Sequence, residues 1–282
     1  MKTGIVLEGG AFRGLFTAGT LDCLMDNQIV FDYVVGVSAG AGNAVNYLAG
    51  QKGRTKWTIT ASGENAYYGV KQMRKSKKML DLDRMVMEFS HKQYPFDFEK
   101  FVASPSEVEL VVTNCETGKA EYKDERMDKE RLMKLCRASS SMPLLAPMVN
   151  VDGTVYLDGG VADSIPIERA MEIGNEKTVV VLTRNPGYRK KPTKKSVAKL
   201  YQRYYKKYPN LVKAAIDRNI VYNQELELIE KLEDEGKIFV IRPLIPTVSR
   251  LEQNPEVLMH FYMHGYRLMK RQYSALVEYL ES

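Results

Sequence analysis

The sequence predicts an α/β fold in which a mainly parallel central sheet is covered by helices on both faces. Short apolar and β-branched runs alternate with segments whose apolar residues recur at helical spacing, a pattern typical of such sheets. A chain of 282 residues with 44% hydrophobic residues can bury a large core. Because small, glycine-rich turns follow the first two apolar runs, we expect strand, turn and helix to repeat from the N-terminus onward.

Thr3–Leu7 is the first predicted strand, and the apolar residues within 18–25 fall at helical spacing after it. The second strand is expected at Phe31–Val37 and passes without a spacer into a helical pattern at Ala44–Leu48. Asp152–Gly153 predicts the turn of a hairpin that leads into a later strand. The remaining strands are expected at Val108–Asn114, Val155–Leu157, Thr178–Thr183 and Lys237–Ile241.

We expect one domain over residues 1–245 and a helical tail over residues 246–282 that packs on it. Residues 55–101 are polar, rich in Met, Tyr and Lys, and contain no run typical of a buried strand. They predict a helical insertion over one edge of the sheet, which is a candidate lid. In the tail, Pro255–Leu280 predicts one or two amphipathic helices.

Composition and charge narrow the classes of protein. The formal charge of +6, from 41 basic and 35 acidic residues, is modest for this length and does not indicate nucleic-acid binding. The three cysteines are widely spaced and fit neither a disulfide framework nor a zinc site, so no metal is expected. No run of eighteen apolar residues occurs, and Glu8 interrupts the first apolar segment before a signal sequence could form. We therefore expect a cytoplasmic protein.

The candidate nucleophile lies where the second predicted strand passes into a helix. Residues 36–40 read Gly-Val-Ser-Ala-Gly, which fits G-x-S-x-G in the strand-turn-helix setting that this motif requires. Gly36 and Gly40 allow neighbouring chains to approach a strained Ser38 closely. The helix N-terminus would add positive partial charge beside a developing oxyanion. The alternative is that Ser38 is an ordinary helix N-cap.

A glycine-rich loop at residues 8–14, Glu-Gly-Gly-Ala-Phe-Arg-Gly, follows the first strand and opens the first helix. Its N–H groups therefore lack partners within the helix. The dinucleotide pattern fails because Ala11 occupies its second required glycine, and the Walker A spacing is absent. We favour an oxyanion hole, which requires this loop and Ser38 to meet at the carboxyl edge of neighbouring parallel strands. A tight turn without a ligand is the alternative.

A serine hydroxyl needs a base to accept its proton, and histidine is the usual choice. Only three histidines occur: His91 lies in the polar insertion, and His260 and His264 lie four residues apart in the C-terminal helical pattern. None of them ends a predicted core strand, so the sequence favours a different base.

Asp158 does end a predicted strand, and it is followed directly by Gly159 and Gly160. Such a position presents a carboxylate at a sheet edge and leaves space for a second group. A Ser/Asp dyad with Ser38 is the natural inference. Taken alone, an Asp before two glycines is also typical of a structural turn.

Three motifs, in order, resemble those of the patatin-like phospholipase family. Residues 9–14 resemble its G-G-G-x-[RK]-G loop, residues 36–40 its G-x-S-x-G, and residues 158–160 its D-G-[GA]. Residues 138–143, Ala-Ser-Ser-Ser-Met-Pro, also resemble the family's small-residue stretch before a proline. The resemblance extends from about Thr3 to Asn185.

This resemblance implies a three-layer α/β fold, with residues 1–245 as a patatin-like catalytic domain. It implies metal-free and cofactor-free hydrolysis of acyl esters in lipids, as in a phospholipase A or lysophospholipase. Ser38 would be the nucleophile and Asp158 the base, with the backbone of Gly10 and Ala11 as oxyanion donors and Arg13 ordering the loop. The whole oxyanion loop would comprise Gly9, Gly10, Ala11, Arg13 and Gly14, and the supporting glycines would be Gly36, Gly40, Gly159 and Gly160.

Ala11 departs from the family pattern, because it replaces the third glycine of the loop. If this position requires a positive φ, alanine adds strain of about 1 kcal/mol and misaligns the hole. A catalytically weak or silent lipid- or acyl-binding protein that keeps the fold is therefore the rival hypothesis.

Residues 188–218 hold eleven Lys or Arg and one acidic residue. Apolar side chains recur there at intervals of three and four, which predicts a basic amphipathic helix. One hypothesis is that this helix docks on anionic lipid at the inner face of the membrane. Its lysines for that contact would be Lys194, Lys195, Lys206 and Lys207. The other is that its tyrosines pack on the core and its lysines form a solvated face; no nucleic-acid-binding motif accompanies the patch.

Overall fold

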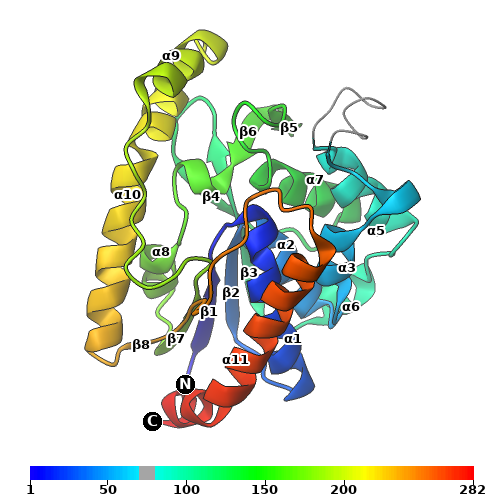
Figure 1. Ribbon diagram of the computed structural model, residues 1–282, viewed down its shortest axis with the longest axis vertical. Coiled ribbons are helices and arrows are strands. Elements are labelled where there is room, and N and C mark those ends of the chain that lie inside the picture. The colour runs from blue at the N-terminus through cyan, green and yellow to red at the C-terminus, as the bar shows by residue number, and fades with distance from the viewer. Residues whose placement is uncertain (70–79) are drawn as a thin grey trace.

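The computed structural model describes residues 1–69 and 80–282 and builds them around one eight-stranded sheet (Figure 1). The strands are β1 (Thr3–Leu7), β2 (Tyr33–Val37), β3 (Glu107–Asn114), β4 (Ala120–Lys123), β5 (Val149–Val151), β6 (Thr154–Asp158), β7 (Lys177–Val181) and β8 (Ile238–Ile241). Their order is β5-β6-β3-β2-β1-β7-β8, and β4 pairs with β3 beside this path. The strands β3, β2, β1, β7 and β8, which are neighbours in this order, run parallel to one another. The strands β4, β5 and β6 join the sheet by antiparallel pairing. The predicted α/β fold with a mainly parallel sheet is confirmed.

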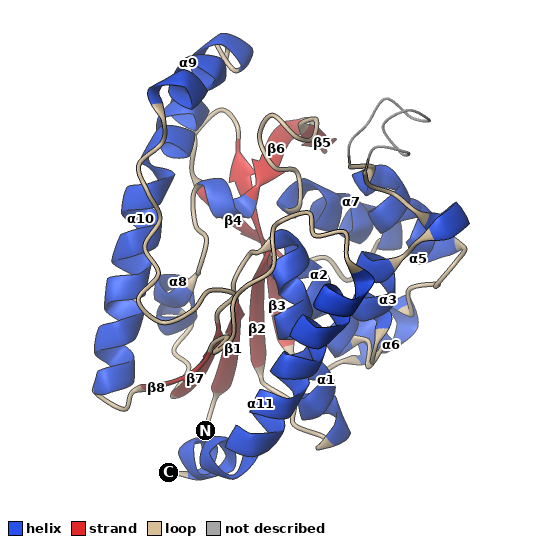
Figure 2. Ribbon diagram, viewed as in Figure 1, coloured by secondary structure: helices blue, strands red, loops and turns tan. Residues whose placement is uncertain are grey.

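Helices cover both faces of this sheet (Figure 2). The longer helices are α1 (Gly14–Asp26), α2 (Ala39–Leu48), α3 (Arg54–Thr60), α7 (Lys129–Ser139), α9 (Lys195–Tyr204), α10 (Pro209–Asp234) and α11 (Pro255–Glu281). The shorter ones are η1 (Ala11–Arg13), η2 (Gly63–Asn65), the π-helix η3 (Asp83–Glu88), α5 (Phe89–His91), α6 (Phe98–Ala103), η4 (Gly159–Val161) and α8 (Ile167–Glu172).

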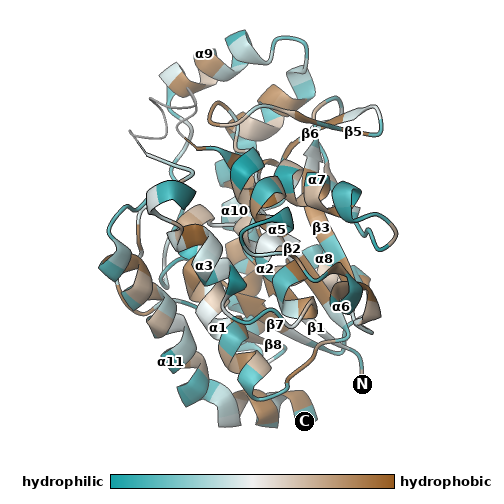
Figure 3. Cartoon of the chain, turned by 90° about the vertical axis from the view of Figure 1, so that its right-hand side faces the viewer, coloured by the Kyte–Doolittle hydropathy of each residue, from teal (hydrophilic) through white to brown (hydrophobic). Residues whose placement is uncertain are grey.

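The alternation of side chains along β1 contributes to two of the three hydrophobic clusters in the described chain. In β1, Ile5 and Leu7 pack with residues of α1, α2 and α11, whereas Val6 packs on the opposite face with residues of α8 and α10. Figure 3 shows hydrophobic residues along β3 and mixed hydrophilic and hydrophobic residues along the outlying helix α9. Because side chains of a strand point alternately to the two faces, one apolar run can serve both layers.

The sheet order brings the carboxyl ends of separate strands together. β1 and β2 are neighbours, with Leu7 opposite Gly36, so the turns after them lie at one edge of the sheet. β3 lies beside β2, and Val112 of β3 pairs with Asp158 at the end of β6. The requirement that the first two strands be adjacent, on which convergence of the two glycine-rich turns depends, is met.

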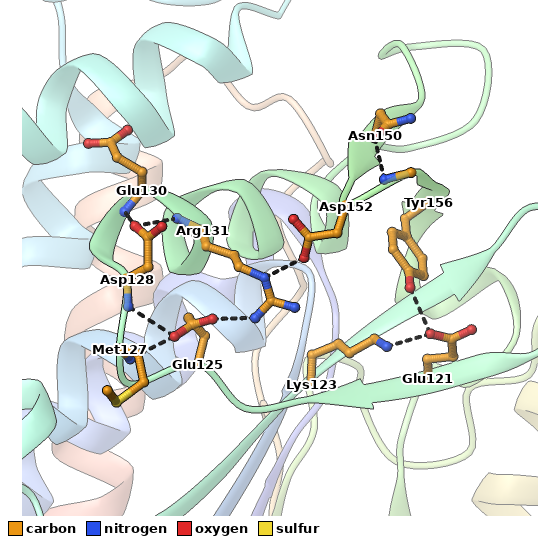
Figure 4. Close-up of polar contacts among 11 residues, drawn as sticks. Glu121, Lys123, Glu125, Met127, Asp128, Glu130, Arg131, Asn150, Asp152 and Tyr156 are labelled. Carbon is orange, nitrogen blue, oxygen red and sulfur yellow. Dashed lines mark hydrogen bonds and ion pairs between the residues drawn. The ribbon is translucent and has the colours of Figure 1, made fainter.

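A polar network fixes the β5–β6 hairpin that carries Asp158 (Figure 4). Arg131 of α7 pairs with Glu125 and with Asp152 in the hairpin turn, the latter at 2.6 Å. Tyr156 of β6 donates a 2.8 Å hydrogen bond to Glu121 of β4. Asp152 and the following Gly153 both have positive φ, so the predicted hairpin turn is confirmed.

The prediction of one helix over residues 188–218 is wrong. Residues 188–194 are a loop, α9 ends at Tyr204, and α10 begins at Pro209. Proline lacks the N–H that an uninterrupted helix would need, but it is well suited to the first turn of a new helix. Figure 1 shows α9 at the end of α10, projecting away from the sheet.

One further difference from the prediction is a short polar strand, whereas the helical insertion is found in the described residues. The strand β4 was not predicted, because Ala-Glu-Tyr-Lys contains no apolar run. The segment predicted as a helical insertion, residues 55–101, holds α3, η2, η3, α5 and α6, and its residues 70–79 lie outside the described part of the chain. Among the described helices, none is both long and apolar enough to cross a membrane.

Candidate active site

Ser38 occupies the sharp turn between β2 and α2. Its backbone has φ 56° and ψ −117°, a conformation that is rare and strained for a residue with a side chain. Its backbone N–H donates a 2.8 Å hydrogen bond to the hydroxyl of Ser139. Although Ser38 stands at the N-cap position of α2, its side chain forms no capping hydrogen bond. The N-cap alternative therefore does not explain where its hydroxyl points.

The glycines on either side of Ser38 are required by close backbone contacts. A Cβ at Gly36 would lie 2.4 Å from the carbonyl oxygen of Gly40, and one at Gly40 would lie 2.2 Å from that of Leu7. Both distances are far below van der Waals contact. The spacing of the motif thus follows from the tight crossing of the Ser38 turn over the end of β1.

Asp158 ends β6 and faces Ser38. The Ser38 hydroxyl donates a 2.8 Å hydrogen bond to Asp158 Oδ2, and the Gly160 N–H donates one of 2.8 Å to Oδ1. The carboxylate therefore also caps the turn that follows it, as the structural alternative required. Both side chains are buried, with Ser38 7% and Asp158 4% exposed. The structure thus brings together the two residues that the sequence paired.

The charge state of Asp158 depends on opposing effects. Burial raises the pKa of the carboxyl above its usual value, because a low-dielectric surrounding disfavours the ionised form. The positive charge of Arg218, the hydrogen bonds from Ser38 and Gly160, and the charge of Arg250 act in the opposite direction. A raised pKa strengthens the carboxylate as a base for a serine hydroxyl.

The glycine-rich loop lies directly against Ser38. A Cβ at Gly9 would lie 3.3 Å from the Ser38 Cβ. Ala11 has φ 49°, so the position where the family pattern has glycine does adopt the left-handed conformation. The backbone N–H groups of Gly10 and Ala11 donate no hydrogen bond to any described residue, which leaves both available to a ligand. At Gly14, a Cβ would lie 2.7 Å from that of the residue after Ser38.

Arg13 contributes to this loop through its backbone, whose N–H bonds to the Gly10 carbonyl at 3.1 Å. Its side chain was expected to order the loop, but the guanidinium forms no hydrogen bond with the described residues. It lies buried beside Ser38 and Asp158 instead. Burial, followed by the charge of Arg184, lowers the pKa of Arg13 to about 10.

Ser139 is a supporting residue whose role the sequence did not predict. Its hydroxyl accepts from the Ser38 N–H and donates to the carbonyl of Val111 at 2.7 Å, fully buried at the end of α7. It therefore holds the strained turn against β3. The available signal was its place in the small-residue stretch 138–143, which indicates close packing but not this contact.

An apolar cavity of about 100 Å³ opens beside Ser38. Its walls come from α2, α3, η3 and α7, and include Val45, Ile59, Met85 and Met133. Such a lining suits an acyl chain, because it offers apolar surface and few competing hydrogen-bond partners.

A second hollow of about 30 Å³, polar in its lining, borders both Ser38 and Asp158. We call it the cationic hollow. Its basic residues are Arg13, Arg184, Lys190, Arg218 and Arg250. Four of these five residues were not singled out from the sequence as parts of the site, because they come from separate segments that meet only in the fold.

The histidines lie elsewhere and line neither hollow. His91 pairs with Glu130 at 2.9 Å, and His264 accepts a hydrogen bond from the Leu244 N–H at 3.0 Å. Within residues 1–69 and 80–282, no cluster of His, Cys, Asp or Glu has a geometry that could hold a metal ion.

Two family models match the chain. Residues 5–171 match the model of the patatin-like phospholipases, and residues 208–281 match that of a domain of unknown function. The first match covers β1 to α8, including Ser38 and Asp158.

Known proteins resemble the chain both in sequence and in fold. The uncharacterized protein YjjU of Escherichia coli is 30% identical over 187 residues, which are 64% of this chain and 52% of that protein. The chain therefore spans about half the length of this relative. The crystal structure of VipD from Legionella pneumophila aligns with a TM-score of 0.51 at 14% identity, over 97% of this chain and 67% of VipD. This second likeness supports the fold alone.

Proposed function

The chain belongs to the patatin-like phospholipase family, and from this membership we propose that it is a serine acyl-ester hydrolase acting on lipid esters. Its reaction would be that of a phospholipase A or lysophospholipase. The observation that carries the proposal is the buried 2.8 Å hydrogen bond from Ser38 to Asp158. The unpaired amides of Gly10 and Ala11 and the apolar cavity beside Ser38 support it.

In the proposed reaction, the Ser38 Oγ attacks the ester carbonyl carbon while its proton passes to Asp158 Oδ2. The N–H groups of Gly10 and Ala11 stabilise the negative oxygen of the tetrahedral intermediate. When the bond to the alcohol breaks, Asp158 returns the proton to the leaving oxygen and Ser38 keeps the acyl group. A water, deprotonated by Asp158, then hydrolyses the acyl-enzyme and restores both residues.

Turnover of a short-chain p-nitrophenyl ester tests this proposal. The unmodified chain should hydrolyse the ester, and Ser38→Ala should lower the rate to near background. Ser274→Ala, a change at an exposed serine of α11, is the matched control and should retain full activity. Equal turnover by the Ser38→Ala variant would refute the assignment of the nucleophile.

A silent lipid- or acyl-binding protein remains the second candidate, and the positive φ of Ala11 is the observation that favours it. Strain at this position would tilt the amides of the oxyanion hole. A chain that binds a fatty acid in the apolar cavity but turns over no ester would support this candidate.

We also propose that the helix α9 and the N-terminal end of α10 dock on anionic lipid. Tyr204 is 71% exposed there and Leu200 is also exposed, which leaves apolar surface at the projecting tip. The exposed lysines around them are Lys194, Lys195, Lys206 and Lys207. Tyr205, in contrast, is buried and accepts a hydrogen bond from the Leu144 N–H, so part of the tyrosine stripe packs on the core.

Sedimentation with vesicles, with and without anionic lipid, tests this docking. Binding should require anionic lipid and should weaken when the four lysines become Gln. The matched control changes four exposed lysines elsewhere to Gln, namely Lys119, Lys134, Lys231 and Lys270. Equal loss in both variants would attribute binding to net charge and refute a docking surface at α9.

A further inference from the structure

The cationic hollow has more basic than acidic side chains in its lining. Two carboxylates line it, Glu8 and Asp158, against five basic residues. Glu8 is already engaged, because it accepts hydrogen bonds from the Tyr222 hydroxyl and the Thr183 N–H. Asp158 is engaged with Ser38. The basic residues therefore cannot all be neutralised by the acids at hand.

Four of the five basic side chains lack a hydrogen-bonding partner among the described residues, whereas Arg184 donates one hydrogen bond, to Thr247. Within the described chain, Arg13, Lys190, Arg218 and Arg250 form no side-chain hydrogen bond or ion pair, and the Nε atoms of Arg13 and Arg218 are buried without a partner. Arg13 is only 5% exposed. Buried charges are normally paired or hydrogen-bonded, because an isolated one is costly. Such a group of basic side chains without partners is complementary to an anion.

The electrostatics of Lys190 point in the same direction. Burial, and after it the positive charge of Arg218, lowers the pKa of Lys190 to about 6. The charges of Glu8 and Glu225 act in the opposite direction. The amine of Lys190 packs over the ring of Tyr222, 3.8 Å from the centroid. A bound anion would relieve this repulsion and favour the protonated lysine.

The position of Asp158 decides which part of a substrate would enter the cationic hollow. Asp158 lines this hollow and does not line the apolar cavity, whereas Ser38 borders both. The group that returns the proton to the leaving oxygen must lie next to that oxygen. The acyl chain therefore extends into the apolar cavity, and the alcohol portion of the ester extends into the cationic hollow.

We propose that the substrate is an acyl ester whose alcohol carries a phosphate monoester, held by Arg184, Lys190 and Arg218. This inference rests on the proposed hydrolase activity and names its substrate class. A phosphate monoester carries close to two negative charges and several acceptor oxygens, and guanidinium groups bind such oxygens in pairs. Hydrolysis releases a fatty acid and the phosphorylated alcohol, with the phosphate ester bond unchanged.

The origin of the cations links this specificity to the C-terminal part of the chain. Arg184 follows β7, Arg218 lies on α10, and Arg250 lies in the loop before α11. All three lie outside residues 5–171, the part that matches the patatin-like family. The segments beyond the family match thus supply the charges that would select the alcohol.

Lys190→Gln is the most informative variant. The backbone N–H of Lys190 donates a hydrogen bond to the Asn223 side chain, and its carbonyl accepts one from the same side chain. These backbone hydrogen bonds remain when the lysine side chain changes. Lys190 is also not among the largest influences on the pKa of Asp158, unlike Arg218 and Arg250. Arg184→Gln provides a second variant, and Lys191→Gln, at the exposed neighbouring position, is the matched control.

The experiment compares hexanoyl glycerol phosphate with uncharged hexanoyl glycerol. Values of kcat/KM are measured for the unmodified chain and the three variants. Binding of both compounds and of inorganic phosphate to the Ser38→Ala protein, with and without Lys190→Gln, is measured by calorimetry. Thermal melting confirms that each variant is folded.

We expect kcat/KM to favour the phosphorylated ester by roughly tenfold or more, as charge-assisted hydrogen bonds predict. Lys190→Gln and Arg184→Gln should reduce this preference severalfold, and Lys191→Gln should preserve it. No preference, or a preference that both variants retain, would overturn the proposal. Inorganic phosphate that binds as tightly as hexanoyl glycerol phosphate would assign the hollow to free phosphate and would also overturn it.

The binding arm separates this inference from the proposed hydrolase. If neither ester is hydrolysed, the hydrolase proposal fails. Selective binding of the phosphorylated compound, sensitive to Lys190→Gln, would then still establish the phosphate site. Turnover of both esters at equal rates would retain the hydrolase and reject the phosphate site.

Discussion

The hydroxyl of Ser38 and the carboxylate of Asp158 form a direct 2.8 Å hydrogen bond, although 120 residues separate them in the chain. One residue follows a parallel strand of the sheet, and the other ends an antiparallel hairpin strand on the far side of β3. No histidine lies between them. A proton could thus pass from serine to aspartate in one step.

Asp158→Asn should lower kcat by about 10²- to 10⁴-fold, because the amide cannot accept the serine proton. The melting temperature at neutral pH should stay level or rise. The folded-state pKa of Asp158 is raised, so the folded chain binds that proton more tightly than the unfolded chain. The ionised carboxylate therefore costs stability above its folded-state pKa, and asparagine removes this cost.

Ester turnover and thermal melting check this prediction together. Asp234→Asn, an exposed change at the end of α10, should leave kcat unchanged. A fully active Asp158→Asn protein would show that the carboxylate is structural.

The pH profile of kcat/KM on a neutral ester should report the ionisation of Asp158. The rate should fall as the pH decreases through a pKa above the usual aspartate value, since the base must be ionised. Arg218→Gln removes a positive charge that lowers this pKa, so the acidic limb should move to higher pH. Arg203→Gln, at an exposed position of α9, is the control. An acidic limb that stays in place in Arg218→Gln would contradict the assignment.

Ser139→Ala should destabilise the protein by about 1–3 kcal/mol in the free energy of unfolding. The change removes the hydroxyl that the buried Ser38 N–H and the Val111 carbonyl bind. It should also lower kcat, because the Ser38 turn loses its contact with α7. Urea denaturation measures the stability. Ser140→Ala, whose hydroxyl has no hydrogen bond to a described residue, should change it by less than about 0.5 kcal/mol.

Ala11→Gly should raise or preserve activity and should stabilise the fold by up to about 1 kcal/mol. Glycine removes the strain of the positive φ, and this gain exceeds the added flexibility of the unfolded chain. The control, Ala198→Gly in α9, should instead cost about 0.5–1 kcal/mol. Denaturation and kcat measured on both variants check the prediction. A loss of stability in Ala11→Gly equal to that of the control would show that no strain is stored at this position.

The buried parallel strands were predictable from the sequence. Runs such as Ile5–Leu7 are apolar because both faces of the sheet are covered, and the predicted strand Thr3–Leu7 matches β1 residue for residue. Ser38 and Asp158 could also be paired, because each directly follows or ends a core strand and has small neighbours. These signals are local in sequence.

The other features depend on contacts between distant segments. Ser139 acts through a hydroxyl that reaches across to β2, and nothing in its neighbours indicates that contact. The cationic hollow gathers side chains from η1, α10 and two loops, which become one surface only in the fold. The helix is interrupted between Tyr204 and Pro209. This interruption was not predicted, because apolar residues recur at helical spacing on both sides of it.

Labelling with a fluorophosphonate, followed by mass spectrometry of the digested protein, tests the central assignment most directly. We predict a single adduct on Ser38, absent from the Ser38→Ala protein and formed much more slowly by Asp158→Asn. An adduct on a different residue, or undiminished labelling of the Ser38→Ala protein, would contradict the account.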